Sequence, residues 1–405
     1  MRYGVVMFDD EVRKSSGNKK RVANGASVSI DGGTSRRIVS VSELESDVKW
    51  LTNFGFTDFN ANGLGRNPNF YFSGFLRTEF RAIAEEIGAG SEQLSADKTA
   101  EMMSTLFGRV MRVATGTLGV DLKTNSISTK GLADFIAARI INRNKIPDEI
   151  NTALSHAYQT YTTVMARVPR DWKKVMLRTP RYLHALDVLS TPVPSESQWV
   201  YLQNARLPES NSDRIGWCLG NELPVLANVV VKPRRGEYGS LISYNAGAAN
   251  ARTWVCQPEL LMLAQYCDVE VIGAFVCEAG FEAQKEIESF PDFGDFTLAS
   301  FSLGLIAENF WVSMASPRTS PTNQKFFPPR AIWYRATDRI SMFMQAVKLQ
   351  REKFQVYSYG LGNVTVYYPP GATKDMTDFA LAMGLDVPAA TFAEIRTELR
   401  LNEDE

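Results

Sequence analysis

The chain has 405 residues, of which 44% are hydrophobic and 22% are charged, and this composition is typical of a globular protein with a large core. Its formal net charge is −1 at pH 7, so the chain as a whole is not basic. The four cysteines form no CxxC pair and there are only two histidines, which disfavours a structural zinc site and a histidine-based hydrolase. No stretch is apolar enough for a membrane span, so we expect a soluble, cytoplasmic protein.

The first residues predict a β element. Arg2–Phe8 has the pattern of a strand, while Ala26–Ile30 and Arg36–Val41 flank Asp31-Gly32-Gly33, a hairpin turn. The polar segment between the first two strands is predicted to be a flexible loop that could hold phosphates. Its five cations are Arg13, Lys14, Lys19, Lys20 and Arg21.

The next part of the chain changes from aromatic to helical. Residues 53–75 place seven aromatic side chains among glycines and asparagines, which predicts a loop, and Arg66 lies within it. From there to about residue 190 helices are expected. Ser95–Ala114 carries an apolar stripe at helical spacing, and Pro147 begins a helix with two acids in its first turn.

The segment from Arg167 to Tyr182 is the strongest functional candidate. It interleaves cations with aromatic residues, and single-stranded nucleic acid needs cations for its phosphates and aromatic faces for its bases. The alternative is an amphipathic helix whose cations are solvated. The residues concerned are Arg167, Arg170, Trp172, Lys173, Lys174, Arg178, Arg181 and Tyr182.

The second half of the chain has a mixed pattern. Leu226–Val231 and Val269–Val276 are predicted as buried strands, and Asp338–Gln350 as a helix. The strands Phe354–Tyr359 and Asn363–Tyr368 flank a glycine-rich turn and predict a hairpin. A weaker basic candidate follows the strand Leu226–Val231. It comprises Lys232, Arg234, Arg235 and Tyr238.

Signals for catalysis are weak, and we predict that the protein is not an enzyme and needs no metal or organic cofactor. The chain contains no phosphate-binding loop of the G-x-x-x-x-G-K-[ST] type. The best alternative is a metal-dependent nuclease using Asp9 and Glu11, because an Asp-x-Glu pair after a strand resembles the first metal-binding motif of proofreading exonucleases. Tyr334 and Asp338 have the spacing of the last motif of that family, whereas Asp58 is a poor match for the middle one.

The end of the chain is acidic. A capping-box pattern at Thr391–Glu394 predicts a helix, and the final residues are Leu399-Arg400-Leu401-Asn402-Glu403-Asp404-Glu405. With the chain length and the basic-aromatic segments, this end resembles the single-stranded-DNA-binding RNA polymerase cofactors of phages related to coliphage N-four. The resemblance implies cooperative binding of single-stranded DNA as a homo-oligomer in the infected bacterial host. It also implies recruitment of a single-subunit phage RNA polymerase.

We therefore predict an α+β protein with mixed helices and antiparallel sheet, not a simple OB barrel. The expected divisions are residues 1–195, with a β element and a helical region, residues 196–390, with a mixed region, and residues 391–405, with a capped acidic helix. The predicted function is sequence-non-specific binding of single-stranded DNA, with Glu403, Asp404 and Glu405 contacting the polymerase. A phage structural protein is the remaining alternative.

Overall fold

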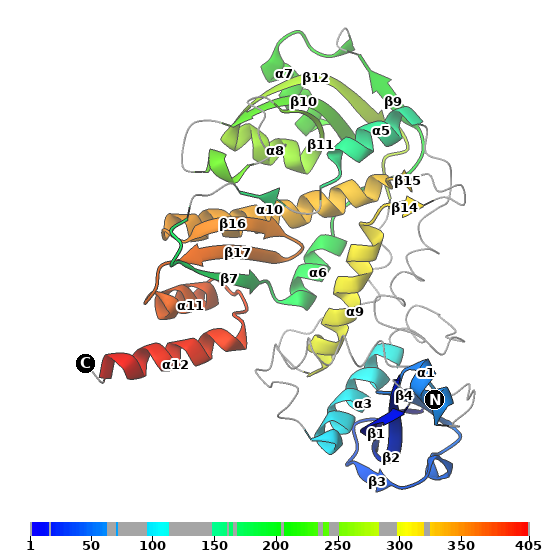
Figure 1. Cartoon of the computed structure of the whole chain (residues 1–405). Helices are drawn as coiled ribbons and strands as arrows, with labels where there is room; N and C mark the ends of the chain where they lie inside the picture. The colour runs from blue at the N-terminus through cyan, green and yellow to red at the C-terminus, as the bar shows by residue number, and fades with distance from the viewer. Residues whose placement is uncertain are drawn as a thin grey trace. The chain divides into compact units, whose positions relative to one another are not determined.

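The computed structural model describes residues 2–15, 18–62, 70–71, 95–112, 148–159, 162–164, 168–203, 206–233, 238–242, 251–282, 298–319 and 325–403. The chain forms two compact units (Figure 1), of which unit 1 comprises residues 1–136 and 289–310 and unit 2 comprises residues 137–288 and 311–405. The predicted division after residue 195 thus falls within unit 2. The α+β prediction is confirmed, because the described residues form helices and several antiparallel sheets, none of which closes into a barrel.

Unit 1 is built on a five-stranded sheet with the strand order β3-β2-β1-β4-β5. The pairs β1–β2 and β2–β3 are antiparallel, while β4 runs parallel to β1 and β5 runs parallel to β4. The strands are β1 (Arg2–Ser15), β2 (Asn18–Ile30), β3 (Arg36–Ile38), β4 (Val48–Thr52) and β5 (Phe70–Tyr71). The other elements are the 3-10 turn η1 (Val41–Glu43), α1 (Phe56–Ala61), α3 (Ala96–Arg112) and the first part of α9 (Leu298–Met314).

Both faces of this sheet are buried, because the strand residues alternate between two apolar layers. One layer contains Val6, Phe8 and Trp50, and the aromatic residues Phe54 and Phe70 complete it. On the other face Tyr3 meets Phe107 of α3 edge to face, with 5.5 Å between the ring centroids. Two of the aromatic residues of segment 53–75 therefore belong to the core.

The basic segment Arg13–Arg21 was predicted as a flexible loop, and this prediction is wrong for the backbone. The arms of β1 and β2 continue through it as an antiparallel ladder that pairs Val12 with Arg21, Arg13 with Lys20 and Lys14 with Lys19. A ladder of backbone hydrogen bonds forms whatever the polarity of the side chains, so the missing apolar alternation gave no sign of a strand.

Unit 2 contains two four-stranded sheets and two short two-stranded ribbons. The first sheet has the order β11-β10-β12-β9 and the second the order β6-β16-β17-β7, and every pair in them is antiparallel. The first sheet is formed by β9 (Trp199–Leu202), β10 (Val225–Pro233), β11 (Ala251–Cys256) and β12 (Cys267–Cys277). The second is formed by β6 (Thr162–Thr163), β7 (Lys173–Arg178), β16 (Gln355–Gly360) and β17 (Asn363–Tyr368). The ribbons pair β8 (Val193–Pro194) with β13 (Phe281–Glu282) and β14 (Arg318–Thr319) with β15 (Lys325–Phe326).

One apolar core joins the inner faces of both sheets to the helices of unit 2. It includes Val229 of the first sheet, Val366 of the second, Leu260 of α8 and Phe343 of α10. The long helix α10 runs along the second sheet (Figure 1). The helices are α5 (Asp148–Ala157), α6 (Arg181–Leu189), α7 (Asn211–Gly220), α8 (Gln257–Tyr266), α10 (Pro329–Arg351), α11 (Thr373–Ala382) and α12 (Ala389–Glu403), with the 3-10 turn η4 (Gly239–Leu241).

Candidate nucleic-acid interface

The outward face of the β6-β16-β17-β7 sheet carries cations beside aromatic rings. In β7 the side chains alternate, so that Val175 and Leu177 are buried in the core. Lys174 and Met176 lie on the opposite face, where Lys174 is exposed and 44% of Met176 is accessible. The register continues this face across β17, because Lys174 is paired with Tyr367, and Arg178 with Asn363.

Lys174 lies between two tyrosines. Its Nζ atom is 3.8 Å from the ring centroid of Tyr357 and 5.6 Å from that of Tyr367. The two rings meet edge to face with their centroids 5.6 Å apart, and both side chains are partly exposed. Tyr357 can join this cluster because the β16–β17 ladder has a bulge between Val356 and Ser358. The arrangement provides a positive charge and two aromatic faces on one open surface.

The hairpin between β16 and β17 is held in place by a buried carboxylate of α10. Asp338 is fully buried and accepts hydrogen bonds from the backbone N–H groups of Leu361 and Gly362, with lengths of 2.6 and 2.8 Å. The Nε2 atom of His184 lies 2.9 Å from Asp338 Oδ1. At the same edge, Arg178 Nε donates to Asn363 Oδ1 over 3.1 Å, which fixes the guanidinium beside the sheet face. These hydrogen bonds therefore fix the turn to α10.

The predicted segment Arg167–Tyr182 forms a strand and a helix start rather than one amphipathic helix, and its residues point to different environments. Arg170 is exposed in the turn before β7, and Trp172 is partly buried. Lys173 Nζ lies 3.2 Å from Glu394 of α12. Arg181 is the first residue of α6.

Tyr182, the next residue of α6, cannot offer a stacking face as predicted. Its side chain is only 5% exposed, because this position lies on the buried side of the helix. Arg167, the first residue of the same candidate, lies outside the described residues.

In the described part of the structure, the other predicted basic segments do not lie on this face. The backbones of Arg13, Lys14, Lys19, Lys20 and Arg21 belong to unit 1, and their side chains are outside the description, as are Arg66, Arg234 and Arg235. Lys232 is exposed on β10 of the first sheet. The Tyr238 hydroxyl accepts a hydrogen bond of 2.9 Å from Arg351 Nε. Glu403 is the last residue of α12, and Asp404 and Glu405 lie beyond the described residues.

Sequence reasoning missed Tyr357, Tyr367 and Met176 as members of a surface. The two tyrosines lie in strands that were correctly predicted as a hairpin, but a hairpin does not reveal which strand pairs with its outer edge. The period-2 alternation of Lys174, Met176 and Arg178 was the available signal, and it was hidden because the segment was considered part of a helical region.

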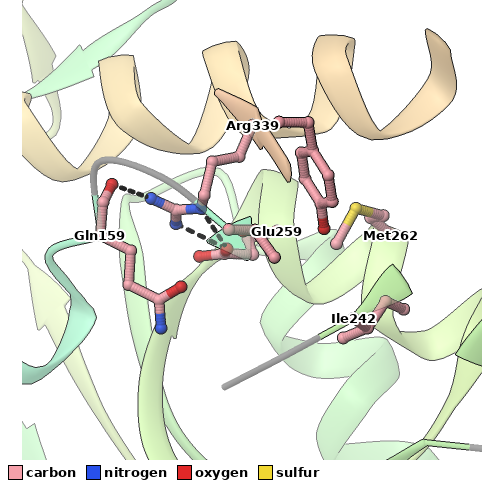
Figure 2. A pocket seen from close by; sticks show the side chains of 7 residues that line it. Gln159, Ile242, Glu259, Met262 and Arg339 are labelled. Atoms are coloured by element: carbon pink, nitrogen blue, oxygen red, sulfur yellow. Dashed lines mark hydrogen bonds and ion pairs between the residues drawn. The ribbon is translucent and has the colours of Figure 1, made fainter. Parts of the chain in front are cut away.

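A small pocket lies in the core of unit 2 (Figure 2), lined among others by Gln159, Glu259, Met262 and Arg339. Arg339 forms hydrogen bonds with Glu259 of 2.6 and 3.1 Å and donates to the Gln159 carbonyl over 2.5 Å. Burial raises the pKa of the Tyr359 hydroxyl, which also lines it, well above its usual range. The pocket has room for about one water molecule, so we assign it to the packing of the core.

The nuclease alternative has no metal centre in the described residues. Asp9, in the middle of β1, forms an ion pair with Arg37, and Asp58 lies in the first turn of α1. Asp338 is occupied by the hairpin turn and His184. No group of three or more His, Cys, Asp or Glu residues in the described part of the chain could hold a metal ion, and the side chain of Glu11 is outside that part. Within the same described residues, no helix is both long and apolar enough to cross a membrane.

No protein-family model matches this chain, and no curated protein matches it. Among solved structures it is similar to phi29 DNA polymerase in complex with primer-template DNA, with 10% identity over 92% of this chain and 82% of the other, and a TM-score of 0.49. Phi29 DNA polymerase complexed with single-stranded DNA gives 10% identity, the same coverage and a TM-score of 0.44. The family B DNA polymerase from the hyperthermophilic archaeon Pyrobaculum calidifontis gives 11% identity over 95% of this chain and 56% of the other, with a TM-score of 0.38.

These comparisons correct one prediction. The proteins compared are DNA polymerases, which are enzymes, so the prediction that this protein is not an enzyme is contradicted. Recruitment of an RNA polymerase has no counterpart among the compared structures.

Proposed function

We propose that this protein binds single-stranded DNA across the outward face of the β6-β16-β17-β7 sheet. The observation that carries the proposal is the cluster of Lys174, Tyr357 and Tyr367, with a lysine 3.8 Å from one tyrosine ring and 5.6 Å from the other. Stacking of a base on an aromatic side chain contributes about 1–3 kcal/mol and works with every base. Cations beside the rings neutralise phosphates and release their counterions.

The face favours unpaired bases for a geometric reason. In a duplex each base is already stacked between its neighbours, so a tyrosine on a flat sheet can reach a base face only in a single strand. Met176 adds an accessible apolar contact beside the rings, and Arg178 adds a second cation at the hairpin end of β7. None of these contacts reads a base edge, which supports binding without sequence preference.

The binding test compares Tyr367→Leu and Lys174→Ala with the wild type, using fluorescence anisotropy of labelled single-stranded and duplex oligonucleotides across a salt series. We expect Tyr367→Leu to weaken single-strand binding by about 1–3 kcal/mol and to leave the salt slope unchanged. Lys174→Ala should reduce the salt slope by about 0.7. A denaturing gel of the probe separates loss of binding from cleavage.

Matched controls are available on the same unit. Phe281→Leu removes an aromatic side chain that is 40% exposed in β13, and Lys325→Ala removes an exposed lysine in β15. Both controls should bind like the wild type. If folded Tyr367→Leu and Lys174→Ala also bind like the wild type, this face is not the binding surface.

We also propose, from the resemblance to the phage cofactors, that the bound protein recruits a single-subunit RNA polymerase through its acidic C-terminal end. The supporting feature is the exposure of α12: among its side chains at residues 390–397, which the structure describes, only that of Thr391, near the start of the helix, is buried.

A further inference from the structure

A second aromatic cluster lies on the other sheet of unit 2. Tyr201, Phe275 and Trp254 come from β9, β12 and β11, and their ring centroids are 5.0 Å (Tyr201–Phe275), 5.3 Å (Trp254–Phe275) and 6.3 Å (Tyr201–Trp254) apart. They lie on the face opposite the core, because the residues that alternate with them, Ala274 and Val255, belong to the core. Tyr201 is 42% exposed and Trp254 is partly exposed, while Phe275 is buried, so the cluster is reached from the tyrosine side.

Asn228 places a buried amide in the same cluster. In the register of the sheet it is paired with Trp254 on one side and with Gly273 on the other, and directly paired residues share a face. Its side chain is only 8% exposed. Within the described part of the chain, Asn228 Oδ1 accepts no hydrogen bond, although a buried amide oxygen left without a donor costs about 1–3 kcal/mol.

Gly273 shapes the surface over which the tyrosine lies. A Cβ atom at this position would stand 2.7 Å from the Tyr201 hydroxyl oxygen and 3.3 Å from a ring carbon, so any side chain would push the ring away. The hydroxyl end of the tyrosine therefore lies against the backbone of β12 at Gly273, next to the strand that carries Asn228.

We propose that this cluster is a second stacking site, which holds an unpaired base bearing an exocyclic amino group. The rings supply the stacking face, and the buried Asn228 Oδ1 accepts a hydrogen bond from the amino group of cytosine, adenine or guanine. Thymine fits less well, because its ring N–H lies between two carbonyl oxygens that would face the asparagine oxygen. The identity of the ligand as single-stranded DNA rests on the proposed function.

The described charges near this cluster are of both signs. Lys232 lies on the same face of β10, four residues from Asn228, which is about 13 Å along the strand. In the register of the sheet it is opposite Asp268 of β12. Glu270, two residues further along β12, is exposed. Because the aromatic side chains carry no charge, changes in the aromatic cluster should alter affinity without altering its salt dependence.

The test measures anisotropy with labelled oligo-dC and oligo-dT of equal length. The wild type should bind oligo-dC about 2- to 10-fold more tightly, the range expected for one hydrogen bond. Tyr201→Leu should weaken oligo-dC binding about 5- to 150-fold with the salt slope unchanged, and the Phe281→Leu control should not. Asn228→Leu should remove the preference for oligo-dC.

A melting curve separates a site residue from a structural one. Asn228→Leu replaces a buried polar group without a donor by an apolar group, so the melting temperature should stay the same or rise. A lower melting temperature together with unchanged preference would overturn the role of Asn228. If Tyr367→Leu weakens binding but Tyr201→Leu does not, the second site is refuted and the proposed function stands. If the wild type binds no single strand, both are refuted.

Discussion

Glu196 is a carboxylate that shares one guanidinium with a second acid. Its side chain is 5% exposed, and its Oε1 atom lies 3.4 Å from Arg330 Nε, while Glu282 takes the other side of the same guanidinium at 2.6 Å. Burial raises the pKa of Glu196 to about 7, Arg330 opposes this shift, and the charge of Glu282 adds to it. Proton uptake by this one residue is therefore linked to folding near neutral pH.

The pH dependence follows from the sign of this shift. The folded pKa lies above the unfolded value of about 4.5, so the folded state holds more protons between the two values and stability falls as the pH rises through that window. Glu196→Gln cannot ionise, so relative to the wild type it should gain up to about 3 kcal/mol of unfolding free energy between pH 5 and pH 8. Urea unfolding at both pH values measures this change. The exposed Glu278→Gln serves as the control, and parallel pH profiles for Glu196→Gln and wild type would contradict the assignment.

Buried charges also explain which residues the sequence concealed. The helix predicted as Asp338–Gln350 in fact begins at Pro329, and its first turns bury Arg330, Arg335 and Asp338. A prediction based on the spacing of apolar residues does not count charged residues as part of a core. They are tolerated because each has specific partners, as when Arg335 Nε donates to the Ala315 carbonyl, and those partners come from distant parts of the chain.

The β16–β17 hairpin is the element in which sequence and structure agree best. Its glycine-rich turn requires left-handed backbone, with φ of 132° at Gly360, 54° at Leu361 and 68° at Gly362. Both flanking strands were predicted from their alternation. The partner strand β7 was not predicted as a strand. It is short and contains two lysines, so its β conformation depends on pairing with β17.

A pair of glycine substitutions tests how tightly this turn is packed. Gly362 has positive φ, and a Cβ atom there would meet His184 at 3.0 Å and Thr179 at 3.1 Å. Gly371 also has positive φ, of 81°, but a Cβ atom there would meet nothing within 4 Å. Both alanine variants should lose about 1 kcal/mol of unfolding free energy through backbone strain. Gly362→Ala should lose a further ~1–3 kcal/mol because its Cβ atom is crowded. Urea unfolding measures both losses, and equal losses would show that the turn is loosely held.

At the scale of the whole molecule, composition and local pattern predicted the α+β class but not the division of the chain. The helical first half and mixed second half expected from the sequence do not correspond to the two units, because unit 2 combines strands from residues 162–178 with a hairpin at 355–368. Pairing over such distances leaves no local signature. The second stacking cluster was missed for the same reason, since Tyr201, Trp254 and Phe275 lie in three separate strands.

The acidic end offers a test of function for the entire chain. Deleting residues 402–405 removes the last two residues of α12 and keeps Glu394, which pairs with Lys173. We expect this truncation to leave single-strand binding unchanged and to reduce transcription that depends on the polymerase partner. Anisotropy and a reconstituted transcription assay measure the two effects. If transcription with the truncated protein is unchanged, the acidic end does not contact the proposed partner.

Unit 1 is assembled from two stretches of chain, residues 1–136 and residues 289–310, and this arrangement has a consequence for synthesis. At about 5–20 residues per second, a ribosome needs roughly 8–30 seconds to translate the intervening residues 137–288. During that interval the nascent unit lacks the part of α9 that contains the fully buried Ala307 and Phe310. A pause in translation within residues 137–288 should therefore prolong the time for which an apolar surface of unit 1 is open to chaperones.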